Sequence, residues 1–346
     1  MPFEIVRNDI SKMQVDAIVN PASRRVRINP GADMAIHKKA GPKLLEARRA
    51  IGDIAVGDAA VTPAFRLDAK YVIHAPSPIW IDGLKGESEQ LIKTYERCLA
   101  LALEYGCESI AFPLMGAGSH GFPKEVALKT AVHVFSNFLM EHEAHIYLVV
   151  FGEESYKVSS KLVQNVASYI DQYYVEAYEQ EIFGLDARRM QARRYAQSRL
   201  VEDEINSSPC APPAIPCDLF NAEIEDDLTG FLKKKDASFA VTLVSLIERS
   251  GKKNPEVYKK ANVDKKLFSK IINNVNYHPT KQTAVAFAIA LGLSLEQTKD
   301  LIGRAGYALT HASKFDLVIE YFILKKNYNI FEINEVLFEL DLPLLG

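Results

Sequence analysis

The sequence has little that would support a secreted, membrane-spanning or zinc-binding protein. Its 346 residues include four cysteines, with no C-x-x-C pair and no histidines at the spacing of zinc ligands. No apolar run approaches the roughly 18 residues of a membrane span, and the first residues have no apolar signal-peptide core. We therefore expect a cytoplasmic protein with free thiols and no metal site.

Neither sign of charge dominates the chain. The formal net charge of -3 argues for no particular class of partner when it is averaged over all residues. Lysine and arginine nevertheless cluster at residues 233–281, directly after an acidic run at residues 223–227. A basic surface is therefore expected in the C-terminal half.

Length and pattern divide the chain into three parts. Residues 1–175 alternate short β-rich runs with helical segments, which predicts an α/β domain with a mixed sheet between two helical layers. We predict a charged helical connector and a proline-rich linker at residues 176–235, and residues 236–346 have an all-helical pattern. In the first part, we predict strands at 3–7, 17–20, 59–62, 71–74, 109–112 and 146–151, and helices at 33–50, 87–105, 123–141 and 155–172.

A glycine-rich turn follows the predicted strand 109–112. Gly116, Gly118 and Gly121 let backbone N–H groups approach an anion, and a helix that opens at Pro123 offers further N–H groups. An ordinary strand-to-helix turn could contain the same glycines. These residues alone therefore leave a phosphate-binding loop and a structural turn both open.

Several stretches upstream make the pattern more specific. The runs 15–23, 31–42, 57–63 and 70–75 precede the glycine turn in a fixed order. Together they resemble the signature blocks of the macrodomain family, which are α/β modules that bind ADP-ribose. The resemblance implies a three-layer α/β/α fold, with ADP-ribose as ligand or product and no other cofactor.

The resemblance also implies roles for individual residues. Asp9, followed by Ile10, matches the acidic residue that accepts a hydrogen bond from adenine, and Phe151 matches the aromatic residue on the adenine ring. Asp33 matches the aspartate that orients water in the hydrolases, and Asn20 is its expected catalytic partner. The loops around the diphosphate and distal ribose would contribute Ser23, Gly31, Ala32 and Ile36 on one side and Met115, Gly116, Ala117, Gly118, Ser119, His120, Gly121 and Phe122 on the other.

Two departures from the family pattern concern activity. Ser23 stands where hydrolases of the MacroD type have a second asparagine, and a bulky, basic loop at residues 24–30 replaces their glycine-rich run. Such a loop could itself meet phosphate or nucleic acid. Because Asp33 is retained, we expect hydrolysis of ADP-ribose adducts on macromolecules or on small esters such as O-acetyl-ADP-ribose. The alternatives are a non-catalytic ADP-ribose sensor and a scaffold with a degenerate pocket.

The C-terminal part resembles a helix-turn-helix domain of the Cro/repressor type. The sequence predicts helices at 239–249, 255–261, 265–275, 280–291 and 295–305, with Asp264 capping the recognition helix. Its exposed face would present Lys265, Lys266, Ser269, Lys270 and Asn273 to DNA. The alternative is a protein-interaction domain in which these lysines are a solvated face.

Overall fold

The computed structural model describes residues 2–151, 165–171 and 237–346. The predicted connector and linker at 176–235, and most of the predicted helix at 155–172, lie outside the described residues. Of these, residues 2–151 and 238–346 belong to one compact unit.

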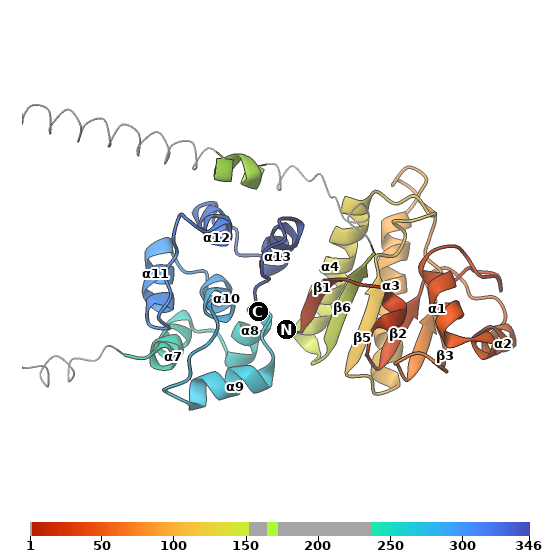
Figure 1. The fold of residues 1–346 in the computed structure, drawn as a ribbon, viewed down its shortest axis with the longest axis horizontal. Helices are drawn as coiled ribbons and strands as arrows, with labels where there is room; N and C mark the ends of the chain where they lie inside the picture. Colours follow the sequence, from red (N-terminus) through yellow and green to blue (C-terminus); the bar gives the residue numbers. More distant parts are fainter. Residues whose placement is uncertain (1, 152–164, 172–236) are drawn as a thin grey trace, which may run out of the picture. The chain divides into compact units, whose positions relative to one another are not determined.

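A six-stranded mixed sheet forms the centre of the N-terminal region (Figure 1). Its strands are β1 (Phe3–Arg7), β2 (Ala17–Asn20), β3 (Ala60–Pro63), β4 (Tyr71–His74), β5 (Ser109–Pro113) and β6 (His145–Val150). Their spatial order is β1-β6-β5-β2-β4-β3, and every pairing is parallel except that of β3 with β4. The predicted mixed sheet is confirmed, with strand ends within one residue of the prediction.

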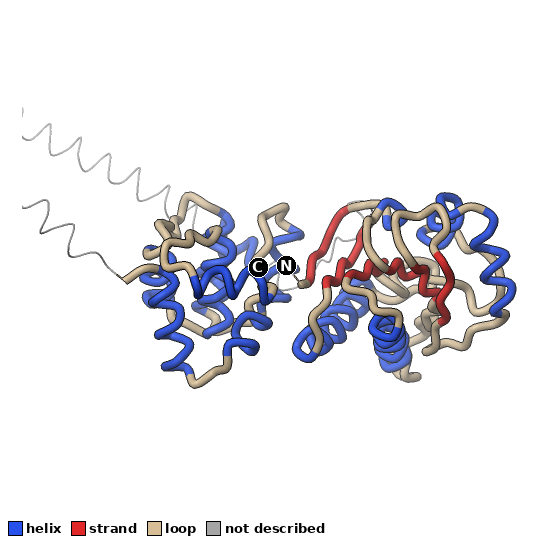
Figure 2. The backbone as a smooth tube through the Cα atoms, turned by 90° about the horizontal axis from the view of Figure 1, so that it is seen from below, coloured by secondary structure: helices blue, strands red, loops and turns tan. Residues whose placement is uncertain are grey.

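Helices cover both faces of this sheet (Figure 2). Side chains such as Val19 and Phe112 point to one face and pack in a cluster with residues of α3 (Glu87–Glu104) and α4 (Lys124–Glu141). Their sequence neighbours Ile18 and Ala111 point to the other face, into a cluster with residues of α1 (Ala32–Ala40), α2 (Pro42–Ile51) and the short 3-10 turn Ile10–Lys12. Because successive strand residues alternate between the faces, both faces of the central strands must be apolar.

The sequence prediction of one helix at residues 33–50 is wrong. Two helices occupy this region, α1 (Ala32–Ala40) and α2 (Pro42–Ile51). Gly41 between them has φ +86°, which a helix cannot contain, and Pro42 has no N–H to continue the hydrogen bonds of α1. The apolar spacing continues across the break, which explains why periodicity alone predicted a single helix.

The C-terminal region is helical, as predicted. It contains α7 (Phe239–Ser250), α8 (Asn254–Lys260), α9 (Lys265–Asn273), α10 (Lys281–Leu291), α11 (Leu295–Gly303), α12 (Lys314–Leu324) and α13 (Ile330–Glu339). Every residue of α10 from Thr283 to Leu291 is buried, so this helix forms the centre of the helical region. Assignment to the helix-turn-helix class stays a prediction from sequence.

The helical region contacts the outer strand of the sheet. Asn262, in the turn between α8 and α9, accepts a hydrogen bond from Phe3 N at 2.9 Å and donates one to Phe3 O at 2.9 Å. Among the strands that the structure describes, β1 pairs only with β6, so its other edge would leave backbone groups unpaired. The amide of Asn262 satisfies two of these groups and is itself buried.

Candidate functional site

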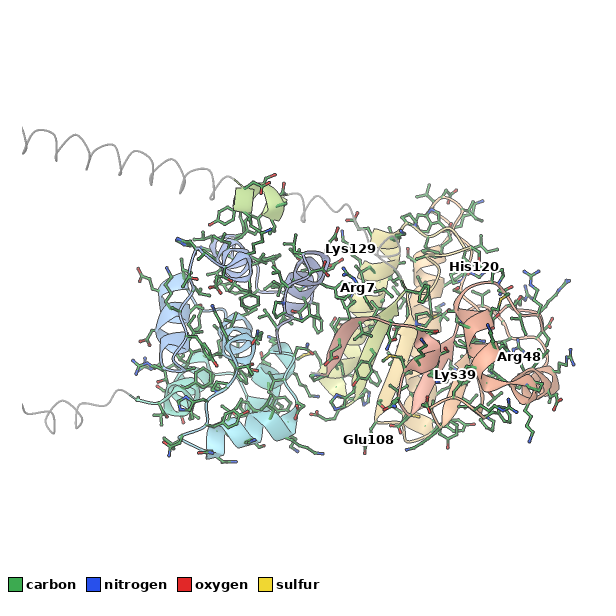
Figure 3. The ribbon with its side chains drawn as sticks, viewed as in Figure 1. Arg7, Lys39, Arg48, Glu108, His120 and Lys129 are labelled. Carbon is green, nitrogen blue, oxygen red and sulfur yellow. The ribbon has the colours of Figure 1, made fainter. Side chains whose placement is uncertain are left out.

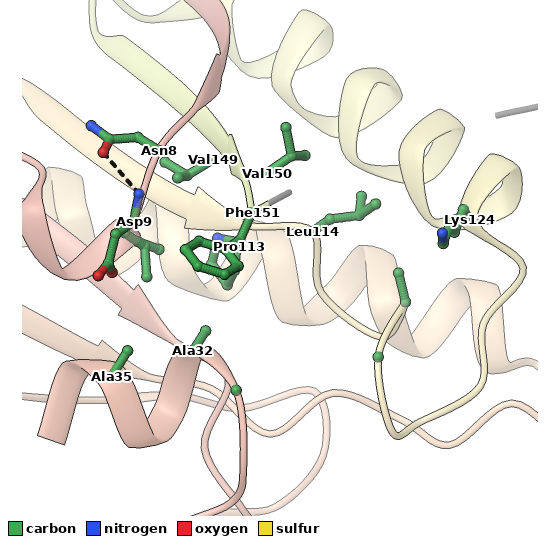
Figure 4. A pocket seen from close by; sticks show the side chains of 14 residues that line it. Asn8, Asp9, Ala32, Ala35, Pro113, Leu114, Lys124, Val149, Val150 and Phe151 are labelled. Atoms are coloured by element: carbon green, nitrogen blue, oxygen red, sulfur yellow. Dashed lines mark hydrogen bonds between the residues drawn. The ribbon is translucent and has the colours of Figure 1, made fainter. Parts of the chain in front are cut away.

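A cavity of about 560 Å³ opens where β1, β5 and β6 end and α1 begins (Figure 4). This is the edge at which parallel α/β sheets bind their ligands, because the loops there converge from several strands. The cavity is lined by Asn8, Asp9, Ile10, Gly31, Ala32, Ala35, Pro113, Leu114, Ala117, Gly118, Lys124, Val149, Val150 and Phe151.

One end of the cavity is formed by the segments that follow β1 and β6. Asn8 N donates to Val150 O at 3.2 Å, which extends the pairing of these strands to the cavity. Asp9 caps the short turn Ile10–Lys12, because its Oδ1 accepts from Ser11 N at 2.9 Å. The ring of Phe151 is 74% exposed and faces the cavity beside Asp9 (Figure 4). A carboxylate and an open aromatic face therefore adjoin each other.

The middle of the cavity is bounded by backbone on two sides. Gly31 has φ +94° and begins α1 without a side-chain cap, so N–H groups of the first turn are available there. On the other side, Ala117 and Gly118 form the tip of the glycine turn, and a Cβ built on Gly118 would have no atom within 4 Å. Two sets of backbone groups can thus approach a ligand closely.

Gly116 has a different function in the same turn. Its φ is +81°, and a Cβ placed there would lie 2.8 Å from the ring of Phe122. Phe122 is buried, its ring lies 4.9 Å from that of Trp80, and its N–H donates to Gly116 O at 3.0 Å. Gly116 is therefore required by the packing of the loop.

Asp33 does not line the cavity. Its side chain is buried, with Oδ1 accepting from Asn20 Nδ2 at 2.8 Å and Oδ2 accepting from Asn29 N at 2.7 Å. His37 Nε2 lies 3.4 Å from the same Oδ1. Oδ2 thus holds the backbone that leads into Gly31 and α1, and Oδ1 links the start of α1 to the side chain of Asn20 on β2.

The polar network continues below Asp33. Asn20 is fully buried, and its Nδ2 also lies 3.2 Å from His74 Nδ1, while His74 Nε2 lies 3.0 Å from Thr62 Oγ1. Burial lowers the pKa of His74 to about 3, with the charge of Arg48 contributing, so this imidazole is neutral at physiological pH. Burial also lowers the pKa of His37, against the opposing effect of Asp33. The network below Asp33 therefore contains neutral imidazoles and helps to hold Asn20 and Asp33 in position.

The structure separates the predicted site residues into distinct groups. Those that line the cavity are Asp9, Ile10, Gly31, Ala32, Ala117, Gly118 and Phe151. Those buried in the protein beside it are Asn20, Ser23, Asp33, Ile36, Met115 and Phe122.

Three further predicted residues, Ser119, His120 and Gly121, lie on the outer part of the glycine turn. His120 (labelled in Figure 3) has its Nδ1 2.9 Å from Ser77 Oγ, and Trp80 N donates to His120 O at 2.8 Å. These contacts fasten the turn to the loop after β4.

Sequence reasoning missed several lining residues, among them Lys124. This residue opens α4 directly after Pro123, so a cation in the first turn after a glycine loop was the signal available in the sequence. The apolar wall formed by Val149 and Val150 had a weaker signal, because these residues read as ordinary strand core.

The predicted nucleic-acid residues lie on α9. Asp264 caps this helix, accepting from Leu267 N at 2.8 Å, as predicted. Lys265, Lys266, Lys270 and Asn273 are exposed, and Ser269 is half-buried.

Neither a metal centre nor a membrane span is found in the part of the chain that the structure describes. No three His, Cys, Asp or Glu side chains are grouped there to hold a metal ion. No helix within those same ranges is both long and apolar enough to cross a membrane.

Comparison with known proteins links the N-terminal region to a family. The family model for the Macro domain matches residues 19–131. A "Macro domain-containing protein" of Methanosarcina mazei is 40% identical over 166 residues, which cover 47% of this chain and 89% of that protein. The "O-acetyl-ADP-ribose deacetylase" of Salmonella typhimurium is 37% identical over 167 residues, covering 46% of this chain and 93% of the enzyme.

Two solved structures are also similar to part of the chain. The Oceanobacillus iheyensis macrodomain with ADP is 29% identical, with a TM-score of 0.43, and the match covers 48% of this chain and 92% of that one. The Trypanosoma brucei macrodomain in complex with ADP-ribose is 32% identical, with a TM-score of 0.41, covering 45% and 66% respectively.

Proposed function

Because the chain belongs to the macro domain family, we propose that the cavity at the ends of β1, β5 and β6 binds ADP-ribose. The observation that carries the proposal is the order of groups along this cavity. A carboxylate and an exposed aromatic ring lie at one end, and backbone from two glycine-containing turns lies beyond them. A nucleoside diphosphate has the matching order of base and phosphates.

The adenine would occupy the end beside Asp9 and Phe151. A carboxylate accepts a hydrogen bond from the adenine amino group but would face the O6 acceptor of guanine, so Asp9 favours adenine. The ring of Phe151 would stack on the base, and Val149 with Val150 adds an apolar wall.

The diphosphate would lie between the start of α1 and the tip of the glycine turn. The N–H groups around Gly31 and Gly118 can donate to phosphate oxygens, and the positive end of the α1 dipole favours an anion. Lys124 adds a positive charge to the same wall of the cavity.

We propose further that the protein hydrolyses ADP-ribose adducts, as the name of its Salmonella relative suggests. The family resemblance assigns Asp33 and Asn20 to this chemistry. Both are buried behind the cavity wall, and Asp33 uses both oxygens to bind its neighbours. Each carboxylate oxygen can accept a second hydrogen bond, so it is burial that keeps Asp33 from water, and direct contact with water or substrate requires the residues that cover it to move.

The engagement of Asp33 also favours a second function, a sensor that binds ADP-ribose without hydrolysing it. The output of such a sensor would be the helical region, where exposed Lys265, Lys266 and Lys270 offer α9 to DNA. Incubation with a carboxylate-linked ADP-ribose adduct separates the two functions. Release of free ADP-ribose supports the enzyme, whereas binding without release supports the sensor.

Calorimetric titration with ADP-ribose tests the binding site itself. Gly118→Glu should abolish binding, because the new carboxylate would project into the phosphate position while nothing in the protein obstructs it. Asp264→Ala, which removes a helix cap on α9, is a matched control and should bind like the wild type. Unchanged affinity in a folded Gly118→Glu protein would contradict the proposed site.

A further inference from the structure

The basic loop between β2 and α1, residues 24–30, is hydrogen-bonded to the residues around it. Ser23 accepts a hydrogen bond at Oγ from Arg27 Nε, 3.0 Å away, and at its carbonyl from a guanidinium nitrogen of Arg48, 3.2 Å away. Ile54 N donates to Arg24 O at 3.1 Å, and Asn29 N is held by Asp33. Arg48 comes from α2 (Figure 3) and is itself buried, so the loop rests on a fixed base.

The side chains on this loop are exposed and positively charged. Arg24, Arg25 and Arg27 are all exposed to solvent. Among the ion pairs between described residues, none includes any of these three, and the one side-chain partner found there for Arg27 is a hydroxyl. Three guanidinium groups within four residues therefore lack neutralising carboxylates in the described part of the chain.

The position of the loop relates it to the far end of the proposed ligand. Asp9 and Phe151 follow β1 and β6 at one side of the sheet, whereas the loop follows β2, two strands beyond β6 in the order β1-β6-β5-β2. The loop leads directly into Gly31, which borders the cavity. A ligand with adenine at the first end and phosphates at Gly31 thus has its distal ribose, and any acceptor attached to it, on the side of the loop.

We infer that the acceptor that bears the ADP-ribose is a nucleic acid strand, whose phosphates contact Arg24, Arg25 and Arg27. The inference rests on the proposed binding of ADP-ribose. An arginine fork matches two oxygens of one phosphate, and closely spaced arginines match a chain that repeats its charge. An ester on a protein carboxylate offers less, since the ester bond removes the charge of the acceptor side chain.

Three phosphate contacts give a measurable dependence on salt. For a single strand, the logarithm of the affinity falls with the logarithm of salt concentration by about 0.7 per neutralised phosphate. Three contacts give a slope of about -2, which means roughly a twentyfold loss of affinity between 50 and 200 mM salt. Free ADP-ribose lacks the strand, so its affinity should fall much less over the same salt range.

The test uses the full-length protein and a short single-stranded oligonucleotide with ADP-ribose on its terminal phosphate. Anisotropy titrations across a salt series should show the steep slope for the wild type. In Arg24→Ala/Arg25→Ala the slope should fall by about 1.4, while the affinity for free ADP-ribose stays unchanged. Arg27 is left in place because it also holds Ser23. The matched control, Lys265→Ala/Lys266→Ala on α9, should keep the wild-type slope.

The possible outcomes separate this inference from the proposed function. Failure of free ADP-ribose to bind would overturn both. Binding of free ADP-ribose with a flat salt dependence for the oligonucleotide would overturn the inference alone. A slope that responds to the lysine pair instead of the arginine pair would assign the strand to α9. Equal affinity for a glutamate-linked ADP-ribosyl peptide would assign the acceptor to protein.

Discussion

Replacement of Asp33 by alanine should destabilise the protein before it affects any chemistry. The substitution removes two short hydrogen bonds to a buried carboxylate, from Asn20 Nδ2 at 2.8 Å and from Asn29 N at 2.7 Å. Hydrogen bonds to charged groups contribute about 1.5–3 kcal/mol each, and relief from burying the charge offsets part of that loss. We expect a net cost of about 3 kcal/mol, and for a unit of this size a fall in Tm of roughly 6–12 °C.

Two further variants make this prediction quantitative. Asp33→Asn keeps the shape of the side chain but replaces one acceptor oxygen by an NH2 donor, which must face either Asn20 Nδ2 or Asn29 N. The loss in free energy of unfolding should therefore be about half of that in Asp33→Ala. Asp9→Ala removes the half-exposed cap of a single turn and should cost about 1 kcal/mol. Thermal unfolding followed by circular dichroism should show the largest fall in Tm for Asp33→Ala, a smaller one for Asp33→Asn and the smallest for Asp9→Ala.

The measurement also decides how kinetic data are interpreted. If the Tm of Asp33→Ala lies within one degree of the wild-type value, the carboxylate does not stabilise the fold, and any loss of turnover comes from the catalytic step. If it is destabilised as expected, its affinity for ADP-ribose should fall too, because Asp33 holds the backbone that leads to Gly31. Turnover must then be compared at saturating ligand and well below the Tm of the variant.

Three other substitutions give clear expectations. Gly116→Ala should cost about 2 kcal/mol in urea unfolding, because its Cβ would meet Phe122 at 2.8 Å with φ at +81°, whereas Gly118→Ala should leave stability nearly unchanged. Burial, reinforced by Glu332, raises the pKa of Glu335 to about 7, above its unfolded value of 4.5. The stability that depends on protonated Glu335 is thus complete below pH 4.5 and is lost as pH rises through 7, by about 3 kcal/mol in all; unfolding of Glu335→Gln should lack this dependence.

The sheet could be predicted closely because its strands are marked by local composition. Central strands buried on both faces, such as β2 and β5, are short apolar runs between turn residues. The break between α1 and α2 had a signal of its own in Gly41 and Pro42, but the apolar spacing outweighed it in the prediction. Periodicity reports which face is buried and is insensitive to a change of helix axis.

For the candidate site, the sequence predicts the types of residues and their order along the chain, but not the contacts of their side chains. Asp9, Gly118 and Phe151 follow the family pattern, and all three line one cavity. The placement of Asp33 was not accessible, because it depends on Asn20 from β2 and on the backbone of Asn29. A sequence indicates that a carboxylate is present but not whether its oxygens face a ligand or bind neighbours.

The contact of Asn262 with β1 limits how the helical region can act. An open strand edge has to be covered, and here a side-chain amide 259 residues away along the chain does so, which no local pattern could reveal. The same residue belongs to the turn before α9, the proposed recognition helix. That turn is therefore held against the sheet, whereas Lys265, Lys266 and Lys270 on α9 are exposed and are the side chains through which the proposed contact with nucleic acid would be made.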